Sequence, residues 1–198
     1  MIKIAAVSDI HGSWKRLQVP EEHRDTELLI LAGDLFSSDS VPTQENELPG
    51  LLQYLHELFD GPEEIIIVPG NHDYLFERKP YLNLSAKVLI DKEYEYISRE
   101  GDIIRIYGNP RTNLMMAFPR LMGEKDIHSI PAGVDILVTH DSPRLCEDGI
   151  GSLRLANHVI NNVRPRIHIF GHHHHRFYKE YEGIKFYNVS CSLTFIEL

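Results

Sequence analysis

Residues that can bind a divalent cation are grouped in five short motifs along this 198-residue chain. In chain order the motifs are Asp9-Ile10-His11, Gly33-Asp34, Gly70-Asn71-His72-Asp73, Thr139-His140-Asp141 and Gly171-His172-His173-His174-His175. Carboxylate, amide and imidazole groups are ligands of divalent metals that accept mixed oxygen and nitrogen donors, whereas a thiolate cluster would need cysteines. These residue types therefore predict a divalent-metal site.

Each motif on its own also admits a purely structural interpretation. Asp9 could cap a helix beside an exposed His11, and Gly33-Asp34 is common in turns because Asp bonds readily to nearby backbone amides. His140 could be a buried core histidine. The run of four histidines from His172 to His175 resembles a purification tag, but it lies inside the chain, not at a terminus. Five such motifs in succession favour one shared site.

All five motifs follow directly on an apolar, β-prone run, and this common position predicts how they meet. The runs are Ile2–Val7, Leu28–Ala32, Ile65–Val68, Ile136–Val138 and Ile167–Phe170. In open α/β sheets the carboxyl ends of the strands lie along one edge, where such folds place their sites. We therefore expect the polar side chains to gather along one edge of a sheet.

The other elements complete an α/β pattern. Leucines and Phe59 at helical spacing predict an amphipathic helix over Glu45–Phe59, and Ser152 is a plausible N-cap for a helix over Ser152–Val163. Further elements are expected at Ser13–Gln18 (one helical turn), Val88–Asp91, Glu95–Ser98, Ile103–Tyr107, Val134–Val138, Phe177–Glu182, Ile184–Val189 and Leu193–Ile196. Residues 109–130 are expected to form a long excursion near the site. The pattern predicts mixed sheets flanked by helices, in a single domain over residues 1–198.

Composition narrows the class of partner. The net charge of -9 argues against duplex nucleic acid, which needs several phosphate-neutralising cations, but it allows a small phosphorylated substrate because bound dications reverse the local potential. Cys146 and Cys191 are too few for a disulfide framework, which favours a reducing compartment. No signal peptide and no apolar run of about 20 residues is present, so we expect a cytoplasmic protein without a membrane partner.

The ordered set of motifs from Asp9 to His174 resembles that of the calcineurin-like metallophosphoesterase family, namely D-x-H, G-D, G-N-H-[DE], H and G-H-x-H. Segments 106–111, 139–143 and 188–190 further resemble a small single-domain subgroup of predicted phosphoesterases. The resemblance implies a β-sandwich of two mixed sheets with helices on the outer faces, holding two metals. It implies Asp9, His11 and His174 as ligands of one metal, Asn71, His140 and His172 as ligands of the other, and Asp34 as a bridge between them.

The resemblance also implies a reaction. Two metals about 3.5–4 Å apart grip a phosphoryl oxygen and activate the water between them, and the metal-bridging hydroxide attacks phosphorus in line. His72 would contact the transferring phosphoryl group or protonate the leaving alkoxide, which makes it catalytic together with Asp34. Mn²⁺, Fe²⁺/Fe³⁺, Zn²⁺ and Co²⁺ all accept these ligands, so the metal is not specified. Within the histidine run, His173 and His175 are predicted to be dispensable.

One departure from the family pattern bears on the substrate. Protein Ser/Thr phosphatases carry Asp and Arg where this chain has Ser37 and Ser38. Without that Arg the site lacks a bidentate clamp for a phosphate dianion, which favours a phosphodiester monoanion such as a small nucleotide-like diester. Without that Asp, the partner that orients His72 is open between Asp39 and Asp73.

Other assignments stay open at this point. Arg111 and Arg144 are candidates for contact with the substrate, as is Arg176, although each could equally be a surface charge. Trp14 could line the site or anchor the short turn that follows the first motif. The alternative activities are phosphomonoesterase or nuclease, and the alternative of another class is a non-catalytic metal-binding regulatory module. The sequence does not specify the oligomeric state.

Overall fold

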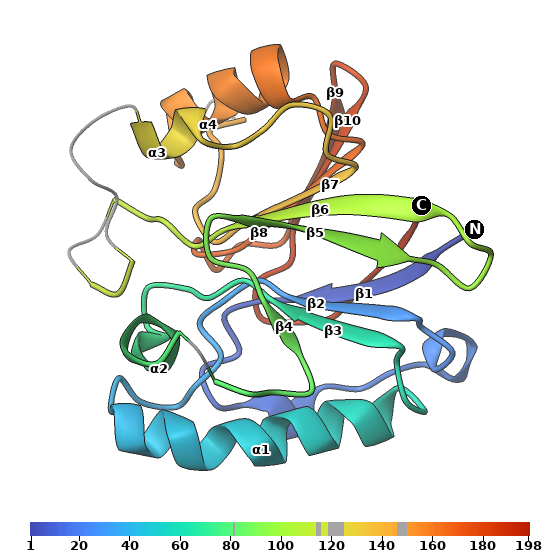
Figure 1. Ribbon diagram of the computed structural model, residues 1–198, viewed down its shortest axis with the longest axis vertical. Helices are drawn as coiled ribbons and strands as arrows, with labels where there is room; N and C mark the ends of the chain where they lie inside the picture. Colours follow the sequence, from blue (N-terminus) through green and yellow to red (C-terminus); the bar gives the residue numbers. More distant parts are fainter. Residues whose placement is uncertain (81, 114–115, 119–124, 146–149) are drawn as a thin grey trace.

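The computed structural model describes residues 1–80, 82–113, 116–118, 125–145 and 150–198, which form two sheets packed face to face with helices on the outer sides (Figure 1). In the first sheet β1 to β4 are parallel and β11 is antiparallel to β1. Its strands, in spatial order, are β11 (Thr194–Glu197), β1 (Lys3–Val7), β2 (Leu28–Leu31), β3 (Glu64–Ile67) and β4 (Lys87–Val88).

The second sheet is also mixed. Its four inner strands run parallel, whereas β5 and β9 pair antiparallel at the two edges. In spatial order the strands are β5 (Lys92–Ile97), β6 (Ile103–Asn109), β7 (Ile136–Thr139), β8 (Ile167–Phe170), β10 (Ile184–Asn188) and β9 (Phe177–Tyr181). The predicted α/β architecture of two mixed sheets flanked by helices is confirmed.

Alternation along the strands builds the core in layers. In β2, Leu28 and Ile30 pack between the two sheets, while Leu29 and Leu31 pack against the helix on the outer face. All four residues are fully buried, which agrees with the continuous apolar run expected of a parallel strand covered on both faces. α1 (Val41–Leu58) covers the first sheet, and α4 (Leu153–His158) lies over the second (Figure 1).

The predicted helices are present with different limits. α1 starts at Val41, four residues before the predicted Glu45. Pro42 is tolerated there because the backbone N–H groups of a helix's first turn have no partner within the helix. Ser152 caps α4 as predicted, its Oγ accepting a bond from the Leu155 N–H at 3.2 Å. The helical segment continues as a π-helical turn over Val159–Val163.

Short elements account for the remaining differences from prediction. The turn after the first motif is a 3₁₀ helix over Trp14–Arg16, and a second one spans Glu21–His23. α2 (Tyr74–Arg78) was not predicted, and α3 (Lys125–His128) lies inside the expected excursion of residues 109–130. Positions 114–115 and 119–124 of that excursion, and Cys146, lie outside the described residues.

The hairpin of β5 and β6 shows why strand limits shift. β5 begins at Lys92, three residues before the predicted Glu95, because six consecutive residues pair with β6 from Lys92 opposite Gly108 to Ile97 opposite Ile103. Pairing with the whole length of β6 thus extends β5 over the polar residues at the start of β5.

Within the described residues, none of the helices is long and apolar enough to cross a membrane.

Candidate metal centre

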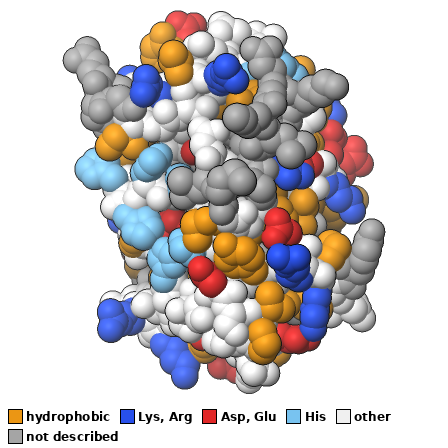
Figure 2. All heavy atoms as spheres, turned by 90° about the vertical axis from the view of Figure 1, so that its left-hand side faces the viewer, with side chains coloured by type: hydrophobic (Ala, Val, Ile, Leu, Met, Phe, Trp, Pro, Cys, Tyr) orange, Lys and Arg blue, Asp and Glu red, His pale blue; other side chains and the backbone are white. Residues whose placement is uncertain are grey.

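The five motifs lie at the carboxyl ends of β1, β2, β3, β7 and β8, so that both sheets contribute to one edge of the sandwich. This edge is on the left-hand side of Figure 1. Figure 2 looks onto it and shows histidine side chains gathered on one part of the surface. The expectation that polar groups converge at one strand edge is confirmed.

Four of the predicted ligands have a backbone conformation that L-residues rarely adopt. The φ angles are +54° at Asp9, +41° at His11, +56° at Asp34 and +69° at His172. Such conformations cost about 1–3 kcal/mol each and persist where surrounding contacts enforce them, as they often do at functional sites. Here the loops hold one another, since the Asp9 N–H donates to Gly33 O at 2.8 Å and the His11 N–H to Asp34 O at 3.1 Å.

Asp9 has one satisfied and one orphaned carboxylate oxygen. Its Oδ2 accepts bonds from the hydroxyls of Ser8 at 2.5 Å and Ser190 at 2.9 Å, and from the His172 N–H at 3.0 Å. Its Oδ1 is buried and has no hydrogen-bond partner among the described residues. A buried carboxylate oxygen without a partner is costly, so this atom is suited to a cation.

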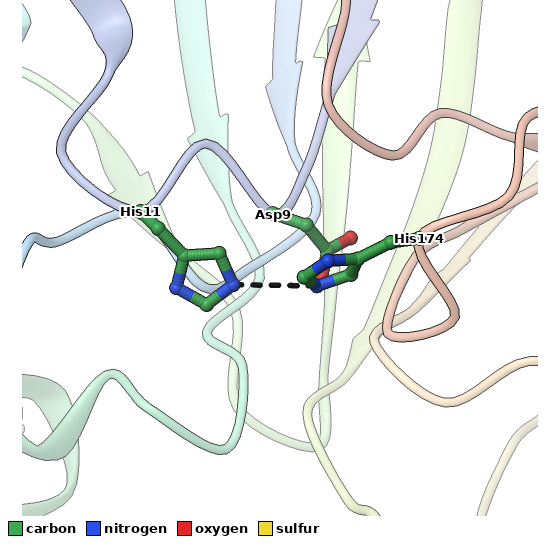
Figure 3. A group of neighbouring side chains, drawn as sticks. All are labelled: Asp9, His11 and His174. Atoms are coloured by element: carbon green, nitrogen blue, oxygen red, sulfur yellow. Dashed lines mark hydrogen bonds and ion pairs between the residues drawn. The ribbon is translucent and has the colours of Figure 1, made fainter.

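The orphaned oxygen belongs to a cluster of three potential ligands, Asp9, His11 and His174, whose side chains point toward one another in Figure 3. His174 Nε2 lies 3.4 Å from Asp9 Oδ1 and 3.3 Å from His11 Nε2. Burial lowers the pKa of His11 even though Asp34 and Asp9 raise it, which keeps the imidazole in its neutral, metal-binding form. This donor set fits a divalent cation.

A second cluster combines Asp34, His140 and His172, and Asn71 adds an amide oxygen to it. His140 Nδ1 lies 2.8 Å from Ala32 O, to which it donates, so Nε2 faces Asn71 Oδ1 at 3.0 Å and Asp34 Oδ2 at 3.4 Å. Metal-binding histidines are typically held in this way, with one nitrogen bonded to a carbonyl and the other free for the metal.

The electrostatics of the second cluster also fit a cation. Burial lowers the pKa of His140, but the adjacent Asp34 carboxylate raises it more strongly, to about 10. Burial raises the pKa of Asp34, and His140 lowers it to well below the ordinary range. Asn71 Oδ1 and Asp34 Oδ2 therefore converge on a position that attracts positive charge. A dication bound there would displace the Nε2 proton of His140.

Asp34 lies between the two clusters. Its Oδ2 is 3.4 Å from His140 Nε2 in one cluster and 3.9 Å from His11 Nε2 in the other, and its Oδ1 accepts the His72 N–H at 2.8 Å. Gly70 permits this placement, because a Cβ at that position would collide with Asp34 Oδ1. A carboxylate in this position can contact ions in both clusters.

The partners of His72 and of Asp73 resolve a question that the sequence left open. His72 Nδ1 lies 2.8 Å from Asp39 Oδ1, so Asp39 orients the imidazole. Asp73 instead accepts three backbone N–H bonds, from Asp34 at 2.8 Å, Leu35 at 2.9 Å and Gly70 at 2.7 Å. It ties the loop after β2 to the loop after β3, and this is a structural role.

Three further residues support the site and were not identified from the sequence. Ser8 and Ser190 fix Asp9, and the buried Gln44 of α1 joins His72 O to the Leu75 N–H, each at 2.7 Å. Ser190 lies in the segment 188–190 that resembles the phosphoesterase subgroup, so that match could have indicated it. Ser8 and Gln44 carry no such pattern.

The arginines proposed as substrate contacts have different surroundings. Arg111 donates from Nε and Nη2 to Asp91 at 2.8 and 2.7 Å, and this ion pair gives it a structural role. Arg176 donates to Thr194 Oγ1 at 3.1 Å. Arg144 is exposed on the loop before α4. Trp14 packs against Tyr54, with ring centroids 5.3 Å apart, as an anchor of the short turn would.

The histidine run offers a competing set of ligands, so the choice of which of its histidines bind metal can be tested. Asp141, His172 and His173 also bring one ligand atom each within 4.8 Å of one another. We predict that His172→Ala lowers the bound metal to about one ion per chain, whereas His173→Ala retains two, because only His172 also reaches Asp34 and His140. Elemental analysis of the dialysed variants measures this, and loss of metal from His173→Ala alone would show that the competing set is used.

The pair of His140 and Asp34 predicts a pH dependence for the metal-free protein. A histidine whose pKa is raised from 6.5 to about 10 stabilises the fold fully below pH 6.5 and loses that contribution as the pH rises toward 10. His172, whose pKa burial lowers to about 4, has its effect only below pH 6.5. We expect Tm to fall by about 5 °C between pH 6.5 and 10. Calorimetry of the chelated protein at the two pH values measures this change in Tm. An equal fall in Tm in the Asp34→Asn variant would refute its assignment to the pair of His140 and Asp34.

Comparison with known proteins agrees with this geometry. Residues 2–176 match the family described as calcineurin-like phosphoesterase. Metallophosphoesterase domain-containing protein 1 of Homo sapiens is 28% identical over 211 aligned positions, which include 87% of this chain and 60% of the human protein. The chain thus spans about three fifths of the length of that relative.

Solved structures show the same fold. The phosphopantetheinyl hydrolase of Mycobacterium tuberculosis superposes with a TM-score of 0.60 at 16% identity, covering 95% of this chain and 88% of that one. The TT1561 protein of Thermus thermophilus superposes with a TM-score of 0.62 at 14% identity, covering 94% and 88%. At these identities the likeness concerns the fold alone.

Proposed function

The chain belongs to the calcineurin-like phosphoesterase family, and on this premise we propose that it hydrolyses phosphoester bonds with two divalent metal ions bound in its two ligand clusters. Asp9, His11 and His174 are the proposed ligands of one ion, and Asn71, His140 and His172 those of the other, with Asp34 between them. The observation that carries the proposal is Asp34 Oδ2, which faces imidazole nitrogens of both clusters.

The side chains around the ligands fit a hydrolytic reaction. Divalent ions supply Lewis acidity, which polarises a phosphoryl oxygen and lowers the pKa of water. His72 stands beside the first cluster, its ring centroid 5.4 Å from that of His11. Because the Asp39 carboxylate accepts the Nδ1–H, the protonated form of His72 can direct Nε2–H at a phosphoryl oxygen or at the leaving alkoxide. His72 therefore positions a proton where negative charge develops.

Local charge favours a phosphodiester over a phosphomonoester. Ser37 donates to Glu47 from both its backbone N–H and its hydroxyl, so the charged partner at this position is an acid and not a cation. The exposed carboxylate of Asp39 adds a second negative group beside His72. A phosphomonoester dianion meets more repulsion here than a phosphodiester monoanion does, and no arginine clamps the extra charge at position 38. A small nucleotide-like diester is the proposed substrate class.

Metal removal and reconstitution test this proposal. The chelated protein is loaded separately with Mn²⁺, Fe²⁺, Zn²⁺ or Co²⁺ and assayed with bis(4-nitrophenyl) phosphate, 4-nitrophenyl phosphate and cyclic nucleotides. We expect activity only after metal addition, with kcat/KM at least about tenfold higher for the diester than for the monoester. A monoester preference would overturn the substrate class. Stable metal binding without turnover of any substrate would favour a regulatory module.

The contact between Asp39 and His72 gives a separate prediction. Asp39→Asn removes the charge that orients and polarises the imidazole, and we expect kcat to fall about tenfold while the bound metal is unchanged. Asp102→Asn, which removes an exposed carboxylate on the hairpin between β5 and β6, is the matched control. Equal kcat values for the two variants would show that Asp39 does not act through His72.

A further inference from the structure

A cleft of about 610 Å³ adjoins the first ligand cluster. Asp9, His11 and His174 form part of its lining, so the cleft is continuous with the proposed catalytic centre. Its volume lies within the range of about 300–1,000 Å³ that is usual for small-molecule sites. The cavity on the side of His173 and His175 measures only about 80 Å³, which is too small for an organic substituent.

Part of the cleft lining is apolar and partly aromatic. Leu17, Leu193 and Phe195 form this wall. The Phe195 ring is stacked on His23, with ring centroids 4.0 Å apart and an angle of 7° between the ring planes. A ring supported in this way forms a fixed wall, which suits a flat apolar group such as an aryl ring or a nucleobase.

One cation, Arg16, stands at this wall. It comes from the 3₁₀ turn Trp14–Arg16 and is exposed. Its guanidinium makes no hydrogen bond or ion pair with any other residue that the structure describes, in contrast to Arg24, Arg99 and Arg111, which are paired with acids. A guanidinium stays charged at every physiological pH and presents donors in a fork that matches carboxylate or phosphate oxygens.

We propose that this cleft binds the ester substituent of the substrate and that Arg16 selects substituents carrying a second negative charge. The inference rests on the proposed function, because it takes the phosphoryl group to lie at the ligand clusters. The apolar wall contacts the ring of the substituent, and Arg16 donates hydrogen bonds to the anionic group attached to that ring. Arg16 is thus a specificity-determining residue that is separate from the metal ligands.

A pair of diesters that differ in one charge tests this selection. 4-Nitrophenyl phenyl phosphate and 4-nitrophenyl 4-carboxyphenyl phosphate both release 4-nitrophenolate, so the readout is the ratio of their kcat/KM values. We expect the ratio to favour the carboxylated diester and to fall in Arg16→Gln by up to about fivefold, the upper end of what an exposed ion pair contributes. Lys15→Gln is the matched control, since Lys15 lies over the Trp14 ring and does not line the cleft.

An unchanged ratio in Arg16→Gln, or an equal fall in Lys15→Gln, would overturn the inference while leaving the proposed hydrolysis intact. If neither diester is hydrolysed with any metal, the proposed phosphodiester hydrolysis fails, and binding still tests the cleft. Cys191 is exposed and lines it, so a bound ligand should slow alkylation of this thiol. Methyl 4-carboxybenzylphosphonate is expected to protect Cys191 more than methyl benzylphosphonate does, and equal protection, or none, would contradict a role for Arg16.

Discussion

We expect Asp34→Asn to lower the bound metal from the proposed two ions per chain to one or none, and to lower kcat/KM for a phosphodiester by about 10³-fold or more, which corresponds to about 4 kcal/mol of lost transition-state stabilisation. The physical reason is the position of Asp34 between the two clusters. An amide is uncharged and offers one oxygen in place of two. Elemental analysis and steady-state kinetics of the same preparation measure both effects.

The design of this variant separates chemistry from folding. In the unsubstituted protein the His72 N–H donates to Asp34 Oδ1 at 2.8 Å. Asn keeps an oxygen that can accept this bond. Asp25→Asn, which removes an exposed carboxylate paired with Lys3, has the same change in charge and should retain both metal and activity. Two ions per chain and near-normal turnover in Asp34→Asn would contradict a bridging role.

We expect His72→Gln to lower kcat by about 10²-fold without loss of metal. The imidazole is half-exposed beside His11, and its Nδ1 is held by Asp39, so the side chain is positioned for proton donation and is not needed as a ligand. The backbone bonds of His72 to Asp34 and Gln44 persist in the variant, which should preserve the loop. Turnover numbers with metal-saturated protein measure the loss.

The leaving group distinguishes two roles for His72. If it protonates the leaving alkoxide, the loss is large for an alkyl ester and small for 4-nitrophenolate, which leaves without a proton. If it contacts the phosphoryl group, the loss is similar for both. His175→Ala, the last position of the histidine run, is the control and should lose little. A metal-depleted His72→Gln protein would show that His72 is a ligand instead.

The strand ends were predictable because two simple patterns coincide there. A short, β-prone and fully apolar segment such as Leu28–Ala32 favours a buried strand, and the polar residues directly after it then lie at its carboxyl end. That reasoning predicted the edge at which Asp9, Asp34 and His140 meet, and the family resemblance supplied the division into two clusters. The geometry agrees with both.

What escaped prediction depends on contacts between loops. The sequence could not choose between Asp39 and Asp73 as the partner of His72, because the choice follows from three backbone amides that converge on Asp73. Sequence proximity made Arg111 a candidate for substrate contact, yet its ion pair with Asp91 forms across 20 residues. Placement in the cytoplasm and the single-domain organisation of residues 1–198 stay predictions.

Anomalous diffraction from crystals of the Mn²⁺-loaded protein tests the central claim most directly. We predict two metal peaks about 3.5–4 Å apart, with Asp34 in contact with both. One ion should contact Asp9, His11 and His174, and the other Asn71, His140 and His172. A single peak, or a peak bound by Asp141, His172 and His173 in place of the second ion, would contradict the proposed dinuclear centre.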